Sequence, residues 1–305
     1  MNTIPEFIMM VGLPASGKST YAEKLAKRID ADLHSTDEIR KEICGDENSQ
    51  EKNDEVFQIV RKRIKDSLKS GRNTIYDATN IHSTYRMAFL NELENEDIEC
   101  ITTCKIMRTP FNVCLRRNSQ RDREVPNFVI ERMYKNWNTP YWFEGWDNID
   151  YVSTGCEDDK DIFNWIQDYL NYEQDNSHHS YTLGQHCIEV ASKFNNNMKL
   201  YCAGLLHDCG KPYTKSFFNS QGEETNEAHY YQHHCVGAYD SLFFKYPERI
   251  DSLDISILIN LHMFPYFWEN DKYNGERTRE KYKKLWGSKL YNEVMRLHIA
   301  DKESH

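Results

Sequence analysis

The sequence predicts two domains, an α/β domain with a parallel sheet and helices on both of its faces, followed by an all-α domain. Two observations predict this architecture. Strand and helix signals alternate through the first half of the chain, and strand signals stop beyond about Asp158. Strands that are separated by helices of ordinary length pair in parallel and are covered on both faces. At 305 residues the chain is long enough for each domain to bury its own core.

The first half contains five expected strands, at residues 7–11, 31–36, 74–77, 98–107 and 148–153. The apolar run Phe7–Val11 leads directly into a glycine, without the basic segment and small-residue cleavage site of a secretory leader, so we expect a buried strand. Between the strands, apolar residues recur at helical spacing, as from Val56 to Leu68, and Gly71 is well placed to end that helix.

The second half shows helical patterns that are separated by polar segments or by proline and glycine. Apolar residues from Ile162 to Leu170 form one amphipathic pattern. The polar segment 173–180 that follows is the best candidate for a linker. We therefore expect a first domain at residues 1–172 and a second domain at residues 181–305.

Composition limits the setting and the partners of this protein. Its hydrophobic content of 39% is typical of a globular protein, and no apolar run approaches the roughly 18–20 residues that a membrane span needs. The nine cysteines show no CxxC spacing, so we expect free thiols in a reducing cytoplasm. The net charge of −10 argues against a protein that coats nucleic acid with its whole surface, but it allows local arginines to bind a strand end.

A phosphate-binding loop is expected where the first strand meets the first helix. The run GLPASGKS fits the pattern GxxxxGK[ST], in which glycines let backbone N–H groups turn toward phosphates and the next helix adds its positive N-terminus. Lys18 is expected to reach the β- and γ-phosphates of ATP or another nucleoside triphosphate, and the Ser19 hydroxyl to hold Mg²⁺. The nucleotide-binding residues of this loop are predicted to be Gly12, Pro14, Ala15, Ser16, Gly17, Lys18, Ser19 and Thr20.

Candidate residues for an acceptor hydroxyl follow the second and third strands. Asp37 follows the second strand and Asp77 ends the third, at the edge of an open sheet where ligands bind. A carboxylate there can take the proton of the acceptor, and Arg40, one helical turn after Asp37, can bind a substrate phosphate. The structural alternatives are an N-cap role for Asp37, in the helix of Ile39 and Ile43, and a cap or turn role for Asp77.

A cluster of arginines follows a helix that starts after Pro110, at Arg116, Arg117, Arg121 and Arg123. Exposed arginines often form only a solvated surface. In a P-loop kinase, however, such a segment is expected to be a lid whose arginines contact the transferring phosphate.

The chain up to about residue 155 resembles the kinase domain of the phage-type 5′-hydroxyl polynucleotide kinases. The runs GLPASGKST, STDEIR, YDATN followed by Arg86, LRRNSQRDREVP and ERMYKNW occur in the order and spacing of that family. LRRNSQR discriminates best, because small-molecule P-loop kinases share the loop but not this run. The phage enzymes continue with an aspartate-nucleophile phosphatase of DxDxT type, and no such signature follows here.

This resemblance implies a role for each candidate of the first domain. Asp37 is expected to be the general base on the 5′-OH, and Arg40 to bind the 3′-phosphate of the acceptor. Asp77 is expected to orient that site. The lid residues Arg117 and Arg121 are expected to contact the phosphates of ATP.

Histidines and aspartates recur through the second half as His186, His207-Asp208, His233, His262 and Asp301. Imidazoles and carboxylates are suitable ligands for Mn²⁺, Fe, Co²⁺, Ni²⁺ or Zn²⁺, and an adjacent His-Asp pair lets the carboxylate bridge two ions. Two such ions can activate water and neutralise a phosphate, and Lys211 can add a further positive charge. A lone histidine is more often structural than a ligand, but this order across five helical segments is far less expected by chance.

The run AGLLHDCGKP resembles the HD phosphohydrolase superfamily, and comes closest to the HD domains attached to tRNA nucleotidyltransferases, where YYQHHCVGA also has a counterpart. The resemblance implies a first metal ion at His186, His207, Asp208 and Asp301, and a second that is completed by His233 and His262. His229 and His234 compete with His233, because all three are expected in one short helix. Surface or tail positions are expected for His178, His179, His298 and His305.

Together the two resemblances imply an RNA end-healing enzyme that uses ATP and Mg²⁺ at one site and one or two transition-metal ions at the other. Ribonucleases that leave a 5′-OH also leave a 2′,3′-cyclic, 2′- or 3′-phosphate, so such an enzyme prepares both ends for a separate RNA ligase. Known fusions of this kind place the HD domain first, the reverse of the order here. RNA, tRNA included, is the favoured substrate, and DNA is a second candidate.

Two other classes of function stay open. One is a small-molecule kinase, for a nucleoside or an antibiotic, joined to a nucleotidase-like HD domain. The other is a nucleotide sensor without catalysis, against which the combination of Asp37 with a lid arginine such as Arg121 argues. The residues predict neither the identity of the metal nor an oligomeric state.

Overall fold

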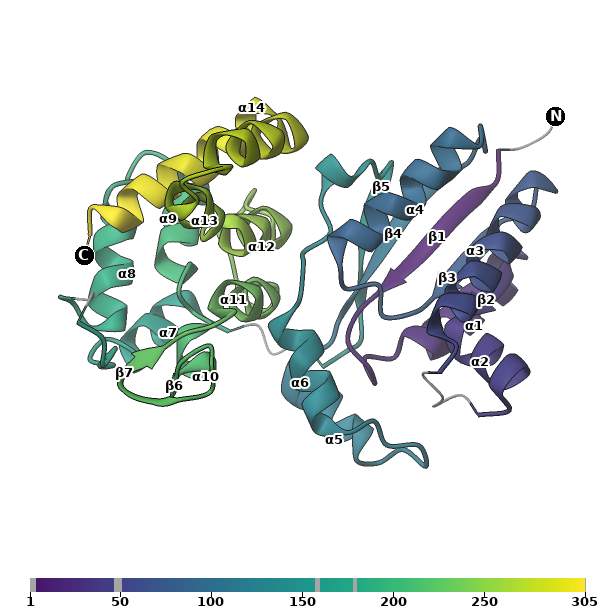
Figure 1. Ribbon diagram of the computed structural model, residues 1–305, viewed down its shortest axis with the longest axis horizontal. Coiled ribbons are helices and arrows are strands. Elements are labelled where there is room, and N and C mark those ends of the chain that lie inside the picture. The colour runs from purple at the N-terminus through teal and green to yellow at the C-terminus, as the bar shows by residue number, and fades with distance from the viewer. Residues whose placement is uncertain (1–3, 47–50, 157–159, 178–179, 305) are drawn as a thin grey trace. The chain divides into compact units, whose positions relative to one another are not determined.

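The structure is a computed structural model that describes residues 4–46, 51–156, 160–177 and 180–304. Contacts divide the chain into two compact units (Figure 1). The first consists of residues 1–130 and 140–157, and the second of residues 131–139 and 158–305. The two units correspond to the predicted succession of an α/β fold and a mainly helical fold.

The first unit is built on a five-stranded parallel sheet, which confirms the predicted α/β class. Its strands are β1 (Glu6–Val11), β2 (Asp32–Ser35), β3 (Thr74–Asp77), β4 (Ile101–Arg108) and β5 (Asn148–Ser153). The strand order is β2-β3-β1-β4-β5. The helices between them are α1 (Lys18–Ile29), α2 (Thr36–Cys44), α3 (Asn53–Lys69), α4 (Ser83–Asn95), α5 (Phe111–Asn118), α6 (Asn127–Lys135) and the short 3₁₀ turn η1 (Trp142–Glu144).

Residues of β1 alternate between the two faces of the sheet. Ile8 and Met10 are buried in a core that includes Leu25 of α1. On the opposite face, the ring of Phe7 lies 5.3 Å from the ring of Phe89 in α4, edge to face. Because helices cover both faces, successive positions of β1 can all be apolar, which explains the uninterrupted hydrophobic run in the sequence.

The order of the strands determines where the ligand site can form. The chain connections reverse direction at β1, which pairs with β3 on one side and β4 on the other. Ligands of open parallel sheets bind at the carboxyl ends of the strands at such a point. The phosphate loop follows β1, Asp77 ends β3, and Asp37 lies in the first turn of α2, directly after β2. The fold therefore brings the loop and both aspartates to one edge of the sheet.

The second unit is mainly helical. Its helices are α7 (Ile162–Asp168), α8 (Leu183–Ser192), α9 (Met198–Leu206), α10 (Lys211–Thr214), α11 (His233–Ser241), α12 (Ser252–Leu261), α13 (Phe264–Asn270) and α14 (Gly275–Lys302). An antiparallel hairpin of β6 (Ser216–Phe218) and β7 (Glu224–His229) interrupts them. The expectation of helices alone is wrong at this hairpin. Because β7 alternates exposed and half-buried polar residues, it lacks the apolar alternation that predicts a strand.

The units also differ from the expected domain boundaries. Residues 131–139 group with the second unit, although α6 begins in the first, and the Tyr134 hydroxyl donates to the Asp240 carboxylate at 2.6 Å. Residues 158–172, expected in the first domain, group with the second unit, and so does the expected linker 173–180. Contacts between residues tens to more than a hundred positions apart produce this grouping, as between Tyr134 and Asp240 or between Gln174 and Lys211, and local sequence patterns do not report such contacts.

The expectation of free thiols from the composition is confirmed. All nine cysteines lie in the described part of the chain and are free. None of the described helices combines the length and the apolar composition that crossing a membrane requires.

A buried ion pair links α4 to η1 inside the first unit. Nε and Nη2 of Arg86 donate to the two carboxylate oxygens of Glu144 at 2.8 and 2.5 Å, and neither side chain is exposed to solvent. The indole N–H of Trp146 donates to the same carboxylate at 2.9 Å. In this bidentate pair, the attraction between the two charges offsets the free-energy cost of desolvating them only while both partners are present.

We predict that Glu144→Ala lowers the free energy of unfolding of the first unit by about 3–5 kcal/mol, because the Arg86 guanidinium stays buried without a counter-charge. Hydrogen exchange of β1 and β4 at increasing urea concentration measures this unit separately. The double variant Arg86→Met/Glu144→Leu, which removes both charges, should recover most of the loss. A loss below about 1 kcal/mol in Glu144→Ala would contradict the prediction.

Candidate functional site

The phosphate loop is held in shape by contacts from both of its sides. Gly17 adopts φ = 93°, a left-handed conformation that glycine enters without steric cost. Lys18 is buried and folds back to donate to the carbonyl of Leu13 at 2.7 Å. From the end of β4, the Thr109 hydroxyl donates to the carbonyl of Ser16 at 2.8 Å. Backbone turns held in this way form a concavity lined by N–H groups, which suits phosphate.

Ser19 and Asp77 meet beside the loop as two candidate oxygen ligands. Their side chains are hydrogen-bonded, and within the described part of the chain the other oxygen of Asp77, Oδ1, is buried without a hydrogen-bond partner. Burial raises the pKa of Asp77, and the ammonium of Lys18 acts against this rise. A cation between the carboxylate and the hydroxyl would stabilise the ionised form. The residues therefore fit the Mg²⁺ ion that the loop pattern implies.

Asp37 lies half-exposed between two arginines. Its Oδ1 accepts from Nη1 of Arg40 at 2.7 Å, and its Oδ2 accepts from Nη1 of Arg123 at 3.3 Å. The buried Arg40 is also held by the side-chain oxygen of Asn53, at 3.3 Å. Ser35 is the N-cap of α2, since its hydroxyl accepts from the N–H of Asp37 at 3.2 Å. Since Ser35 supplies the cap of α2, the Asp37 carboxylate is not used as a cap and contacts the two arginines instead.

The arginine segment reaches both parts of this site. Arg117 lies beside the loop, where a Cβ added to Gly17 would be 3.8 Å from its Nη1. Arg121 is exposed, and its charge adds to the effect of burial in lowering the pKa of Lys18. Arg123, to which the sequence assigned no specific role, contacts Asp37 instead. Arg117 and Arg121 are therefore near the loop, as the lid assignment requires, while Arg123 and Arg40 both contact Asp37.

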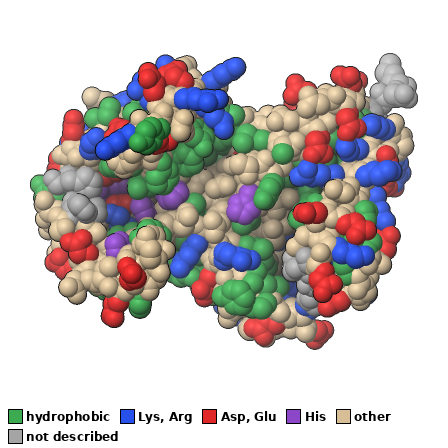
Figure 2. All heavy atoms as spheres, in the orientation of Figure 1, with side chains coloured by type: hydrophobic (Ala, Val, Ile, Leu, Met, Phe, Trp, Pro, Cys, Tyr) green, Lys and Arg blue, Asp and Glu red, His purple; other side chains and the backbone are tan. Residues whose placement is uncertain are grey.

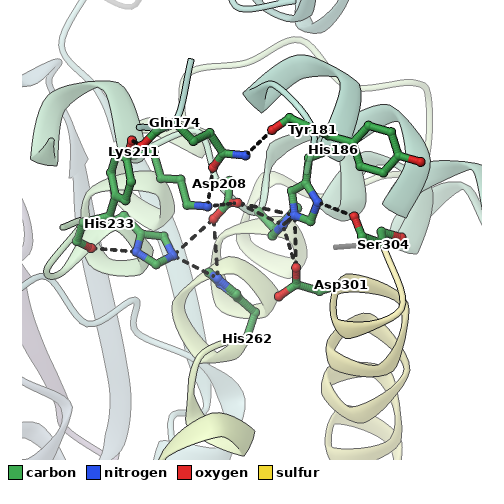
Figure 3. Close-up of polar contacts among 12 residues, drawn as sticks. Gln174, Tyr181, His186, Asp208, Lys211, His233, His262, Asp301 and Ser304 are labelled. Atoms are coloured by element: carbon green, nitrogen blue, oxygen red, sulfur yellow. Dashed lines mark hydrogen bonds and ion pairs between the residues drawn. The ribbon is translucent and has the colours of Figure 1, made fainter. Parts of the chain in front are cut away.

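Two groups of ligand-type side chains lie buried in the second unit (Figure 3). The first consists of His186, His207 and Asp301, and the second of Asp208, His233 and His262. Within each group the candidate ligand atoms lie within 4.8 Å of one another. Residues from α8, α14, the first turn of α11 and the C-terminal ends of α9 and α12 converge here, so the predicted set is brought together in full.

Asp208 lies between the two groups and faces both. Its Oδ2 is 3.3 Å from Nε2 of His207, and its Oδ1 is 3.2 Å from Nε2 of His233. Burial would raise the pKa of Asp208, but the Lys211 ammonium and His207 hold this pKa well below its ordinary value. An ionised carboxylate with one oxygen toward each group has the geometry to bridge two ions.

The four histidines of the groups share one orientation. Each Nδ1 contacts a backbone carbonyl, at distances between 2.7 and 3.1 Å, from Ser304, Gly204, Tyr230 and Ile259. A carbonyl only accepts, so Nδ1 carries the proton and Nε2 keeps its lone pair. The Nε2 atoms face one another in pairs, at 3.1 Å between His186 and His207 and at 3.2 Å between His233 and His262. Lone pairs this close repel unless a proton or a cation lies between them, and the donor set fits divalent metal ions.

Lys211 and Gln174 border the metal groups. The Lys211 ammonium lies 2.7 Å from Oδ2 of Asp208 and donates to the side-chain oxygen of Gln174 at 2.8 Å. The amide nitrogen of the buried Gln174 donates to the carbonyl of Tyr181 at 3.0 Å, which fixes the orientation of the amide. Gln174 belongs to the segment expected to be a linker, and nothing in the sequence of this polar segment indicated that its side chain would be buried.

Several of the remaining histidines lie elsewhere than expected. His229 is in strand β7, not in the helix of His233 and His234. Burial lowers the pKa of His234 to about 3, and this side chain belongs to neither group. His298 was expected at the surface, but it is buried, with Nε2 at 2.9 Å from Glu269. The structure does not describe the three others, His178, His179 and His305.

Two families match parts of this chain. Residues 7–140 match the AAA domain family, and residues 176–304 match the HD domain family. The first match contains the phosphate loop and both aspartates of the sheet edge. The second contains every residue of the two metal groups.

Curated relatives and solved structures share parts of the chain. The L-seryl-tRNA(Sec) kinase of Methanococcus maripaludis is 30% identical over 166 residues, which are 52% of this chain and 64% of that protein. The protein Kti12 of Schizosaccharomyces pombe is 26% identical over 156 residues, 46% of this chain and 54% of that protein. The chain thus spans less than two thirds of either relative.

Two solved structures illustrate the structural likeness. A protein of Chloroflexus aurantiacus described as a kinase has a TM-score of 0.42 and 18% identity, over 55% of this chain and 96% of its own. A chain of the Pnkp1/Rnl/Hen1 RNA repair complex has a TM-score of 0.38 and 21% identity, over 44% of each chain.

We predict that the protein binds two Mn²⁺ ions per chain in the second unit and that His233→Ala loses one of them. The neighbouring variant His234→Ala should keep both, because His234 lies outside the two groups. Metal content after desalting, measured by mass spectrometry on variants with matched circular dichroism spectra, checks the prediction. Equal metal content in His233→Ala and the unaltered protein would contradict a second ion at this group.

Proposed function

Because residues 7–140 form an AAA-family P-loop domain and residues 176–304 form an HD domain, we propose that this chain is a bifunctional RNA end-healing enzyme. The P-loop domain transfers the γ-phosphate of ATP to 5′-OH ends. The HD domain removes 2′,3′-cyclic, 2′- or 3′-phosphates with the help of divalent metal ions. A separate RNA ligase then joins the healed ends.

The observation that carries the kinase half is the environment of Asp37. A phosphate loop alone binds a nucleotide, and transfer additionally needs a site for the acceptor. The Asp37 side chain is 49% exposed and has a guanidinium on each of its two oxygens, from Arg40 and Arg123. A neutral acceptor such as a nucleoside has no use for two arginines beside the base. The 5′ end of a polynucleotide carries a phosphate one sugar away from its hydroxyl, which these arginines can bind.

In this proposal the chain's residues divide the work of phosphoryl transfer. Lys18 and the loop N–H groups hold the phosphates of ATP, and Arg117 lies where it can approach them from the lid. Ser19 and Asp77 would hold Mg²⁺, which would supply further positive charge toward the transferred group. Asp37 takes the proton of the 5′-OH.

The HD half rests on the convergence of the two metal groups on Asp208. The ions that these groups bind would supply Lewis acidity toward a phosphate ester. Lys211, held by Gln174, places a further ammonium beside Asp208, where it can contact a phosphate oxygen. The Tyr266 hydroxyl donates to Oδ2 of Asp301 at 3.1 Å and so leaves the other oxygen directed toward His186.

A second acceptor is favoured by one of the relatives. The name L-seryl-tRNA(Sec) kinase describes a kinase whose acceptor is a seryl group attached to tRNA. Such an acceptor also presents a hydroxyl next to phosphates, so it is compatible with the same arginines. A screen of acceptors that compares 5′-OH oligonucleotides, seryl-tRNA and free nucleosides separates this candidate and the small-molecule kinase from the proposed function.

We predict that Asp37→Ala reduces 5′ phosphorylation by about 10²–10⁴-fold, because it deletes the general base, and spares the removal of 3′-end phosphates, because the metal groups lie in the other unit. Asp208→Ala should have the opposite effect. The assay uses a short RNA with a 5′-OH and a 2′,3′-cyclic phosphate, with ATP, Mg²⁺ and added Mn²⁺, Ni²⁺ or Co²⁺, and scores both ends by mass. Glu38→Ala, which removes an exposed carboxylate next to Asp37, is the matched control.

The outcomes separate the parts of the proposal. A folded variant that loses both activities would contradict two independent sites. Phosphorylation of seryl-tRNA or of nucleosides, without phosphorylation of oligonucleotides, would replace the acceptor. Kinase activity without any change at the 3′ end would leave the HD domain with a different phosphate ester as its substrate.

A further inference from the structure

The first half of α14 and the residues just before it carry a charge opposite to that of the rest of the chain. The stretch 272–289 contains seven basic residues, Lys272, Arg277, Arg279, Lys281, Lys283, Lys284 and Lys289, and two acidic ones, Glu276 and Glu280. Its net charge is therefore 7 − 2 = +5, which leaves −15 for the remainder of a chain of net charge −10. All seven basic residues are exposed. We call this stretch the basic segment.

Carboxylates neutralise few of the positive charges of the basic segment. Within the described part of the chain, an ion pair of this segment joins Lys283 to Glu280 at 3.8 Å. Lysines of α3 behave differently, since Lys62 and Lys65 each lie 2.6 Å from a carboxylate oxygen. The difference indicates that the cations of the basic segment are available to an external anion.

The spacing of the cations adds a second argument. Arg277, Lys281 and Lys284 are spaced i, i+4 and i+7, so they share one face of the helix. Like charges at this spacing destabilise a helix, and cations near a helix N-terminus are also unfavourable. A bound chain of phosphates would reverse both effects.

Aromatic packing fixes the basic segment to the helix that borders the metal groups. Tyr282 and Trp286 of α14 lie with their rings 5.1 and 5.6 Å from the ring of Phe264 in α13. Phe264 follows His262 by two residues, and the same helix carries Tyr266, which contacts the first metal group. The segment is therefore held at a defined position relative to the metal groups.

Phe267 presents an exposed ring beside the metal groups. Its side chain is 55% exposed, and its ring lies 6.2 Å from the ring of His234, next to His233. Figure 2 shows basic side chains along the upper edge of the second unit, a hydrophobic patch below them and histidine side chains below that patch, all on one face. Exposed aromatic rings next to basic side chains are typical of surfaces that bind single-stranded nucleic acid.

We propose that the basic segment binds the sugar-phosphate backbone of the RNA strand whose 3′ end enters the metal groups, with a terminal base stacked on Phe267. The inference rests on the proposed function of the HD domain. From Arg277 to Lys284 the helix rises about 10 Å, which matches about three steps between successive phosphates at a rise of ~3.4 Å per nucleotide. The segment thereby makes the hydrolase act on chain ends in preference to mononucleotides.

The apolar residues of the segment favour RNA over an anionic membrane as the partner. A helix that lies on a membrane exposes apolar side chains along the face opposite its charges. Here Trp286 is buried, and Tyr282 and Leu285 are partly buried. Phosphates in a flexible strand satisfy the cations without such a face.

The test compares the triple variant Arg277→Ala/Lys281→Ala/Lys284→Ala with the unaltered protein on two substrates. For a 3′-phosphorylated RNA of twelve nucleotides we expect kcat/KM to fall at least about tenfold at low salt. The slope of log(kcat/KM) against log[salt] should become shallower by about 2, at ~0.7 for each lost phosphate contact. For a 2′,3′-cyclic mononucleotide kcat/KM should stay within about twofold. Lys62→Ala/Lys65→Ala/Lys69→Ala on α3, with the same change of charge, is the matched control.

Each other result counts against the inference in a distinguishable way. An equal loss on the mononucleotide would show that the segment supports the metal groups themselves. An unchanged RNA profile, or a loss equal to that of the α3 control, would exclude a specific contact. If the unaltered protein hydrolyses neither substrate, the proposed function fails, and filter binding of the same RNA then tests the segment alone. Segment-dependent binding to anionic lipid vesicles, without RNA binding, would overturn the choice of partner.

Discussion

The second unit depends on one electrostatic constraint, the convergence of four buried imidazoles and two buried carboxylates. His207, His233 and His262 each direct Nδ1 to the carbonyl three residues earlier, so the local backbone determines which nitrogen keeps its lone pair. Two of these carbonyls, of Gly204 and Ile259, lie in the last turns of α9 and α12, where carbonyls lack partners within the helix, and the third, of Tyr230, lies just before α11. The hydrogen bonds that orient the imidazoles therefore come from backbone that each histidine itself follows. Asp208 joins the two groups because its oxygens point in opposite directions.

In the first unit a sheet, and not a set of helices, brings the residues of the site together. The parallel strands end at one edge of the sheet, so residues at the ends of three neighbouring strands meet there although they are far apart in the sequence. Among the residues that the structure describes, one buried carboxylate oxygen of Asp77 has no hydrogen-bond partner, a cost that an ion of Mg²⁺ type would offset. Asp37, by contrast, is half-exposed and contacts the guanidinium groups of Arg40 and Arg123. The two aspartates, at the ends of adjacent strands β2 and β3, thus acquire different electrostatic surroundings.

The two sites share an organisation in which a rigid core carries ligands and an adjacent segment carries positive charge. In the first unit this segment is the stretch of Arg117, Arg121 and Arg123. In the second it is the basic segment of α14. Both segments are arginine- or lysine-rich in a chain of net charge −10, so positive charge is concentrated beside each site and not spread over the whole surface.

The sequence alone determined the parts of both sites that depend on local backbone chemistry: the glycine loop with Lys18, the strand-end Asp77 and the His207-Asp208 pair at a helix end. These are local because a loop conformation, a cap or a helix end involves only a few consecutive residues. The tertiary structure alone decided the contacts of Arg123 with Asp37 and of Gln174 with Lys211, the burial of His298, and the grouping of residues 131–139 with the second unit. Each of these features depends on residues that are far apart in the chain. A polar side chain has many local conformations, and only packing of the whole unit selects the one in which its hydrogen bonds are satisfied.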